Sequence, residues 1–334
     1  MGEAMLRYII KRTLWMLPSL IAISFLAFIL IQLPAGDYVT AYVAKQAAAG
    51  QDVEPATIAA LREQFGLNRP MLVQYFDWIS DILLRGDFGM SFEWQQSVNE
   101  LIGERMLLTV ILAFATLAGT WVLALPLGIY SAVRKYSVGD YVLNAITFVG
   151  LALPNFLLAL VAMYIAVMYF NADVGSLFSP AYERAPWSVA KVWDLITHLW
   201  LPVSILAVSG TASLVRIMRA NMMDELRKPY VTTARAKGLS EMRLLFKYPL
   251  RLALNPFIST IPWVLPTLVS GSIVVAITLN LPTAGPILLN ALVGQDMYLA
   301  GAFVLMICLL TLLGSLISDI LLALVDPRIR LNAR

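Results

Sequence analysis

Six stretches without a charged residue dominate the pattern of this chain. They cover residues 13–33, 106–133, 141–172, 195–215, 252–295 and 297–318. Because about 20 apolar residues in a helix cross a bilayer, one crossing per stretch predicts six transmembrane helices. The stretch at 252–295 is long enough for two crossings, but Pro282, Gly285 and Pro286 interrupt its second half. We therefore expect one span there, followed by a short segment that dips back into the membrane from outside.

Composition supports this membrane environment. Hydrophobic residues make up 60% of the chain and charged residues 13%, against about a quarter charged in soluble domains. The fold class predicted is therefore an all-α integral membrane protein. The single Cys308 excludes an intrachain disulfide. The single His198 favours a hydrogen-bonded histidine beside a span over a metal ligand, and we predict no metal or cofactor site in this chain.

The distribution of positive charge predicts the orientation. With six crossings and the N-terminus inside, the cytoplasmic segments 1–12, 134–140, 216–251 and 319–334 hold 17 basic and 7 acidic residues. The outer segments hold 7 basic and 14 acidic residues. Lys and Arg near span ends stay in the cytoplasm, so the prediction is N-in/C-in. The first apolar stretch is longer than that of a cleaved signal, and we expect a retained helix with Pro18 early in it.

These spans divide the chain into three parts. Residues 1–105 hold the first transmembrane helix and an extracytoplasmic helical insertion. Residues 106–325 form the transmembrane core, which includes a cytoplasmic loop at 216–251. Residues 326–334 form a cytoplasmic tail.

The extracytoplasmic insertion is too long for a bare connector. Residues 56–65 have helical spacing and are followed by Gly66, a typical helix C-cap. Residues 71–84 predict an amphipathic helix with Asp77 and Asp81 on one side. Its apolar side is predicted to hold Leu72, Tyr75, Phe76, Ile79 and Leu83. Such a helix suits the membrane surface or packing over the bundle, and the insertion is either a simple cap or a landing surface for an external partner.

The loop at 216–251 carries nine Lys and Arg residues against three acids. Pro229 suits the first turn of a helix, Gly238 supplies a left-handed stop, and Ser240 can cap a second helix that ends near Tyr248. Small residues at this hinge let another surface approach the backbone. The predicted docking residues are Tyr230, Thr233, Ala234, Arg235, Ala236, Lys237, Gly238 and Leu239. The alternative is that these cations serve only as topology signals.

Several motifs are absent. The chain has no GxxxxGK[ST] phosphate loop, no HExxH and no GxSxG, so we predict a transport protein without catalytic residues of its own. No Asp, Glu, Lys or Arg falls within the first five predicted spans, whereas ion-coupled carriers keep ionisable groups at mid-membrane. A secondary transporter or channel not driven by ATP remains the alternative.

Polar residues on apolar helices usually turn toward the interior of a bundle. The candidates for a translocation pathway are Asn155, Thr267, Ser270, Ser272, Thr278, Asn280 and Asn290. For each, the alternative is a hydrogen bond within or between helices. Pro154 is expected to kink the third helix.

Segments along nearly the whole chain carry a resemblance. They are MLRYIIKRTLWMLPSL, LREQFGLNRPMLVQYFDW, LLRGDFGMS, YVTTARAKGLSE and LLALVDPRIRL. They resemble the dipeptide/oligopeptide/nickel permease family of ABC transporters, in which the fourth segment is the coupling helix loop. The glutamate that begins this motif elsewhere is absent, because Thr232, Thr233 and Ala234 stand at the lead positions.

The resemblance implies a type I importer in a bacterial inner membrane. Its expected partners are a second homologous permease as heterodimer, two ABC ATPase subunits that bind ATP and Mg, and an extracytoplasmic substrate-binding protein. The expected cargo is a peptide or similar small polar solute. The outer dip, however, lacks the acidic and aromatic residues of peptide permeases and has Ala276 and Leu279 instead. The sequence therefore does not distinguish among peptides, opines, oligosaccharides and nickel as cargo. It is also compatible with two separate ATPase chains or with one fused pair.

Overall fold

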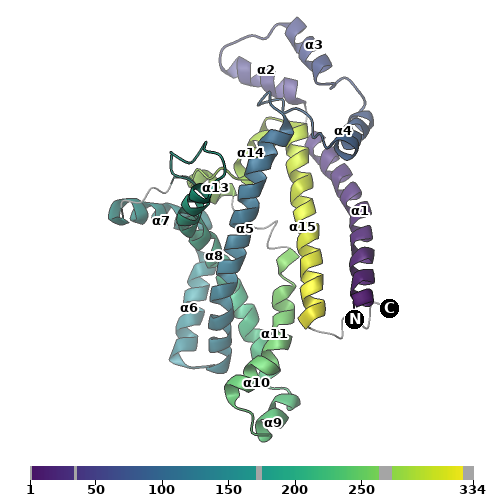
Figure 1. Ribbon diagram of the computed structural model, residues 1–334. Coiled ribbons are helices and arrows are strands. Elements are labelled where there is room, and N and C mark those ends of the chain that lie inside the picture. Colours follow the sequence, from purple (N-terminus) through teal and green to yellow (C-terminus); the bar gives the residue numbers. More distant parts are fainter. Residues whose placement is uncertain (1, 34–35, 171–174, 263–272, 326–334) are drawn as a thin grey trace. The chain divides into compact units, whose positions relative to one another are not determined.

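A computed structural model describes residues 2–33, 36–170, 175–262 and 273–325 (Figure 1). Most of the described residues are helical, with one isolated bridge between Met90 and Ser97 and no strand among them. The chain forms two compact units. The first unit comprises Met1–Thr13, Val110–Pro282 and Thr311–Arg334, and the second comprises Leu14–Thr109 and Thr283–Leu310.

Among the described residues, four helices are individually long and apolar enough to cross a membrane. They are α1 (Gly2–Gln32), α5 (Val98–Val133), α8 (Val189–Leu226) and α15 (Met297–Val325). Helices α6 (Val138–Ala152) and α7 (Asn155–Phe170) meet this criterion only as a pair, which would give five spans. The pair is bent by 101° at the break that contains Pro154. The predicted interruption at Pro154 is confirmed, and it is a break between two helices because proline cannot continue the backbone ladder.

The described part of the remaining charge-free stretch, 252–295, contains several short helices instead of one long helix. Its described parts are α11 (Pro249–Ile258), α13 (Ile273–Thr278) and α14 (Ala284–Val293). Residues 263–272 lie outside the described residues, and with them the candidates Thr267, Ser270 and Ser272. The tail at 326–334 lies outside them as well.

The second unit contains the insertion as α2 (Tyr38–Ala48), α3 (Pro55–Gln64) and α4 (Met71–Arg85). The two helices predicted from sequence are confirmed as α3 and α4, and Gly66 follows α3 with φ +65°. Helix α2 was not predicted, although Asp37 accepts a hydrogen bond from the backbone N–H of Thr40 (2.8 Å), a typical N-cap. These helices surround an aromatic core that includes Phe28, Tyr38, Tyr75, Trp78, Phe92 and Phe303.

The apolar side predicted for α4 is divided between buried and exposed residues. Tyr75 and Trp78 are each only 3% exposed, whereas Phe76 is 63% and Leu83 71% exposed. The helix therefore buries one apolar side in the unit and leaves a second apolar side uncovered. The sequence pattern merged them because both lie away from Asp77 and Asp81.

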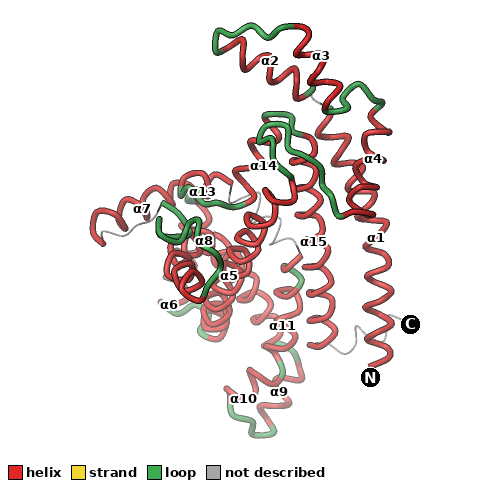
Figure 2. Tube along the Cα trace, turned by 45° about the horizontal axis from the view of Figure 1, so that its top comes forward, coloured by secondary structure: helices red, strands yellow, loops and turns green. Residues whose placement is uncertain are grey.

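The first unit is built around α8. Helices α6, α7 and α11 pack against it (Figure 2). Its core includes Met218, Met222 and Phe257, with Trp121 packed against them. Helix α8 continues to Leu226, so residues 216–226 of the predicted loop are helical. Arg12 pairs with Asp319 (Nε to Oδ2, 2.7 Å), which ties α1 to α15 within this unit.

Pro18 also lies elsewhere than predicted. Because α1 begins at Gly2, Pro18 is in the interior of the helix and not in its first turn. There it removes one backbone hydrogen bond.

Candidate functional site

The basic segment after α8 folds as two short helices joined by a tight hinge. Helix α9 (Pro229–Ala236) begins with its proline in the first turn, and α10 (Glu241–Lys247) follows. Gly238 has φ +77° and donates its N–H to the carbonyl of Arg235 (3.0 Å). The predicted left-handed stop is confirmed. Ser240 occupies the N-cap position of α10, but its hydroxyl caps nothing and only its carbonyl accepts the N–H of Leu244 (2.9 Å).

A small core holds the two helices together. Val231, Ala234 and Leu244 are buried, with Tyr230, Leu239 and Tyr248 packed around them. Across the hinge, Arg235 forms a bidentate ion pair with Glu241, Nε to Oε1 at 2.6 Å and Nη2 to Oε2 at 3.0 Å. The hydrogen bond from Arg235 holds the pKa of Glu241 below its usual value. The α9–α10 element is thus internally fixed, although it consists of short helices that would not be stable alone.

The α9–α10 element is also fixed to the end of α8. The phenol of Tyr230 donates a hydrogen bond to Glu225 Oε2 at 2.5 Å, and Glu225 belongs to the last turn of α8. Burial and this bond raise the pKa of Tyr230, so the phenol remains a donor. A displacement of the α9–α10 element would therefore be transmitted directly to α8.

The predicted docking residues divide into an outer and an inner set. Thr233, Arg235, Ala236, Lys237 and Gly238 are exposed. Ala234 is buried in the small core, and Tyr230 and Leu239 are partly buried. The first set is accessible to another protein, whereas the second supports it from inside.

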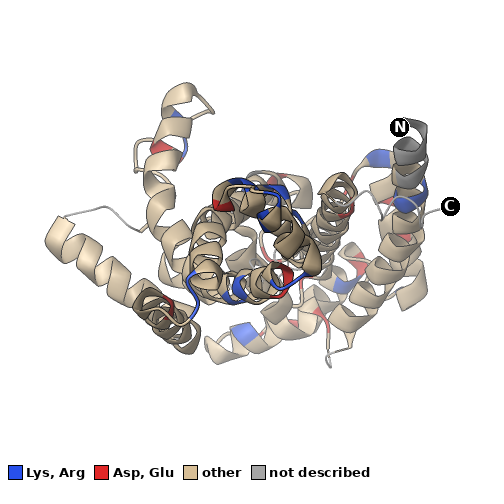
Figure 3. Cartoon of the chain, turned by 90° about the horizontal axis from the view of Figure 1, so that it is seen from below, with Lys and Arg blue, Asp and Glu red and all other residues tan. Residues whose placement is uncertain are grey.

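Positive charge gathers on this element. Viewed from the α9–α10 end, Lys and Arg lie along the two helices nearest the viewer (Figure 3). Lys237 is exposed and forms no ion pair within the described residues. The surface offers donors to an acidic partner and a glycine that admits close approach.

An ion pair with a buried carboxylate joins α8 to α6. Asp140 on α6 is 1% exposed and accepts two hydrogen bonds from Arg219 on α8, from Nε and Nη2, both at 2.8 Å. Asp140 also accepts hydrogen bonds from Ser131 on α5 and from the side chain of Asn144 (2.7 Å). This group, hereafter the α6–α8 clamp, was missed at the sequence level because Asp140 and Arg219 were treated only as topology charges.

The described pathway candidates do not form one polar cluster. Thr278 donates to the carbonyl of Val274 (2.8 Å) in its own helix, the alternative considered for such residues. Asn280 and Asn290 are exposed. The Oδ1 of Asn155 is buried without a hydrogen-bond partner in the described part of the chain, and α7, which carries Asn155, packs against α13. Asn155 is the candidate with an unused acceptor facing the interior.

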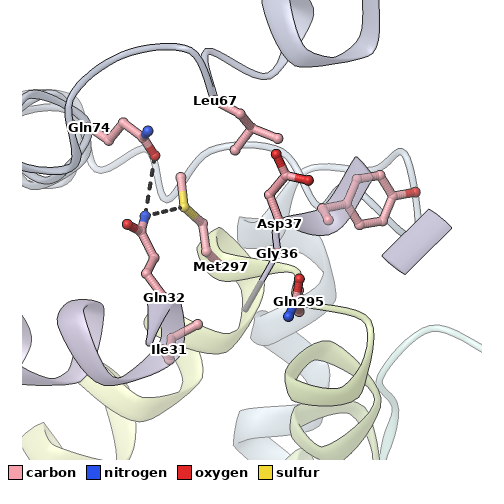
Figure 4. Close-up of a pocket in the computed structure, with 9 residues that line it drawn as sticks. Ile31, Gln32, Gly36, Asp37, Leu67, Gln74, Gln295 and Met297 are labelled. Carbon is pink, nitrogen blue, oxygen red and sulfur yellow. Dashed lines mark hydrogen bonds between the residues drawn. The ribbon is translucent and has the colours of Figure 1, made fainter. Parts of the chain in front are cut away.

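The second unit contains a cavity of about 120 Å³ (Figure 4). Gln32 donates its amide to Gln74 Oε1 (3.2 Å) and to the sulfur of Met297 (2.9 Å) across it. Asp37 and Gln295 complete its polar lining. Gln32 thereby joins α1 to α4 and to the start of α15, whereas Asp37 pairs with Arg62 (3.2 Å) and Gln295 Oε1 has no hydrogen-bond partner among the described residues.

The lone histidine is hydrogen-bonded as predicted. His198 Nδ1 lies 2.8 Å from the carbonyl of Asp194. The ring is thereby fixed beside the helix that carries it.

Comparison with known proteins decides the family. Residues 124–331 match the binding-protein-dependent transport system inner membrane component, and residues 5–113 match the N-terminal part of such membrane components. The chain belongs to this family. It is a permease subunit of an ABC importer and a multi-pass membrane protein, which favours the importer over the secondary transporter or channel considered above.

Relatives matched over nearly their whole length are also transport system permeases. The chain is 36% identical over 330 residues to the oligopeptide transport system permease protein AppB of Bacillus subtilis, covering 97% of this chain and 99% of that protein. It is 32% identical to OppB, an oligopeptide transport system permease protein of Haemophilus influenzae, over 98% of this chain and 100% of that protein. It is 31% identical to the glutathione transport system permease protein GsiC of Salmonella choleraesuis, over 98% and 99%.

Proposed function

We propose that the permease crosses the inner membrane six times with both termini in the cytoplasm. The excess of Lys and Arg in the segments that this topology places inside supports it. In this topology α5 and α8 are full crossings, the α6–α7 pair is one broken crossing, and residues 252–295 contribute one crossing and a return dip. The insertion with α2, α3 and α4 then lies outside and the α9–α10 element inside.

The α9–α10 element is the docking site for partner ATPase subunits in this proposal. ATP and Mg bind to those subunits, and their movement on nucleotide binding displaces the element as a rigid body. Tyr230 and Glu225 pass the displacement to α8, and the α6–α8 clamp passes it to α5 and α6. The pathway then alternates between the two sides of the membrane.

The remaining partners are a second permease, as heterodimer, and an extracytoplasmic binding protein. The cargo proposed is a peptide or a similar small polar solute. Support comes from the relatives, whose names specify oligopeptide and glutathione transport. The binding protein would select the cargo and deliver it to the outer side.

The observation that carries the coupling proposal is the geometry at Gly238. Its φ of +77° is a conformation that non-glycine residues rarely adopt, and a Cβ placed there would meet nothing within 4 Å. The glycine is therefore required by the backbone turn and not by internal packing. Open space beside an exposed hinge is what a closely docking partner needs.

Two substitutions at Gly238 test this. Gly238→Val should uncouple ATP hydrolysis from uptake in the assembled transporter, because a left-handed conformation costs about 1–2 kcal/mol for an ordinary residue and the turn would open. Gly238→Asn is the matched control, since asparagine tolerates this conformation. We expect uptake per ATP to fall several-fold for valine and by much less for asparagine.

Substrate-stimulated hydrolysis and uptake are measured together in proteoliposomes. Unchanged coupling in a correctly assembled Gly238→Val transporter would contradict the docking role. Equal losses for both substitutions would point to a general requirement for glycine at the contact surface.

A further inference from the structure

Helix α4 meets α1 alongside the membrane span, within the second unit. The hydroxyl oxygens of Tyr75 and Ser24 lie 2.8 Å apart and share a hydrogen bond. Trp78 stacks on Phe28 with ring centroids 5.7 Å apart. These contacts involve the candidate span Ile9–Gln32 and not a connector beyond it.

The positions of these contacts along α1 indicate how deep α4 lies relative to the outer end of the span. Phe28 and Ser24 precede the end of α1 at Gln32 by four and eight residues, which corresponds to about 6 and 12 Å along a helix. Helices that lie in a membrane surface bury their apolar side about 5–10 Å into the boundary between head groups and acyl chains. With the outer boundary of the bilayer set at Gln32, where the candidate span ends, α4 contacts α1 at the level of the outermost acyl chains.

The uncovered side of α4 is apolar at this level. Leu72, Phe76 and Leu83 are 55%, 63% and 71% exposed. With about 100° of rotation per residue they fall within about 40° of each other, whereas Asp77 and Asp81 lie about 120–160° away. Each of the two acids forms an ion pair on its own side, with Arg69 (2.9 Å) and Arg85 (3.2 Å) respectively.

Neighbouring packing fixes which side is uncovered. A Cβ added to Gly301 on α15 would lie 3.1 Å from the ring of Trp78, so α4 is seated closely on this helix. Rotation of α4 to hide its apolar stripe would lift Tyr75 and Trp78 from their contacts. The stripe stays exposed, and α1 likewise exposes Leu26 and Leu30 at 57% and 62% along the same part of the span.

We propose that α4 is an interfacial membrane helix whose stripe of Leu72, Phe76 and Leu83 contacts lipid acyl chains. Asp77 and Asp81 face the aqueous side. This occupant fits because the apolar stripe lies at acyl-chain depth and the acids lie on the opposite side. The stripe is then no landing surface for a soluble partner, and the proposal does not depend on the coupling role of α9 and α10.

Spin labels on α4 test this in the full-length chain. In a Cys308→Ala background, labels are placed at Phe76→Cys and Leu83→Cys, with Asp77→Cys and Asp81→Cys as matched positions on the other side. The protein is reconstituted in vesicles of phosphatidylcholine and phosphatidylglycerol. Accessibility is measured to oxygen, which concentrates in the bilayer, and to a water-soluble nickel chelate.

We expect oxygen accessibility to exceed nickel accessibility several-fold at 76 and 83, with the order reversed at 77 and 81. Leu72→Cys repeats the measurement one turn earlier if Phe76→Cys disturbs folding. Nickel accessibility at 76 and 83 equal to that at 81 would overturn the proposal in favour of an aqueous surface. Shielding from both reagents would overturn it in favour of a protein contact, such as a second copy of the chain.

Discussion

At the scale of single residues, Asp296 balances two opposing effects. It is fully buried just before α15, where it accepts hydrogen bonds from the Ser91 hydroxyl and from the backbone N–H groups of Glu93 (3.1 Å) and Leu299 (3.3 Å). Burial raises the pKa of Asp296 above its usual value, although these hydrogen bonds act in the opposite direction. The carboxyl joins the end of the insertion to the start of α15.

This shift predicts a pH dependence. Because the folded state holds a proton on Asp296 more tightly than the unfolded state does, stability falls as pH rises through the folded pKa. The wild type should therefore gain thermal stability relative to Asp296→Asn as pH decreases toward the ordinary aspartate value of 3.8. Near neutral pH the variant should still lose about 1–3 kcal/mol, because one buried donor is left without its acceptor.

Thermal unfolding of both proteins in the same detergent, from pH 7.5 to pH 4.5, measures this difference. A wild type that loses stability relative to Asp296→Asn on acidification would contradict the prediction. It would show that the hydrogen bonds, and not burial, dominate the titration.

At the scale of elements, the α6–α8 clamp links α8 to its neighbours, so that α8 is expected to move together with them. The buried Asp140 and the partly exposed Arg219 form a bidentate pair, which is geometrically specific. Removing one partner of a buried pair costs about 3–5 kcal/mol. A rigid link of this kind lets displacement of the α9–α10 element reach α5 and α6 together with α8.

We predict that Arg219→Lys uncouples transport without preventing assembly. Lysine keeps the charge but cannot reproduce the planar two-point contact, so uptake per ATP should fall several-fold while ATP hydrolysis persists. Arg216→Lys is the matched control, because Arg216 is exposed on the same helix and lies over the ring of Phe148 at 5.2 Å. Uptake and ATP hydrolysis are both measured in proteoliposomes, and their ratio gives the solute transported per ATP. An equal ratio for Arg219→Lys and Arg216→Lys would show that the α6–α8 clamp does not take part in coupling.

Local chemistry explains which elements the sequence could predict. Pro229 and Gly238 determine the start of α9 and the hinge after it through backbone geometry alone, so this element was predictable. The extension of α8 to Leu226 was not, because charged residues such as Arg216 and Asp224 indicate the end of a span but not the end of a helix. The α6–α8 clamp joins residues 79 positions apart, and no local periodicity encodes such a pair.

At the scale of the whole molecule, the bent α6–α7 pair decides the topology. Helices α5 and α8 each satisfy the criterion for a span alone, but α6 and α7 do so only together. If the pair crosses, the turn before α6 and the segment after α7 lie on opposite sides of the membrane. If it dips in and returns, they lie on the same side, and every later segment changes sides.

Four single cysteines in a Cys308→Ala background distinguish these arrangements, at the exposed positions Gln51, Lys135, Glu183 and Ser240. Six crossings predict that a membrane-impermeant maleimide labels Gln51→Cys and Glu183→Cys in intact cells, and Lys135→Cys and Ser240→Cys only in inverted vesicles. The positive charge of the segments around Lys135 and Ser240 is the physical reason, since moving Lys and Arg across the membrane is unfavourable. A returning α6–α7 pair would instead give outside labelling at Gln51→Cys and Ser240→Cys and inside labelling at the other two. That result would place the α9–α10 element outside the cell and remove the basis for its coupling to cytoplasmic ATPases.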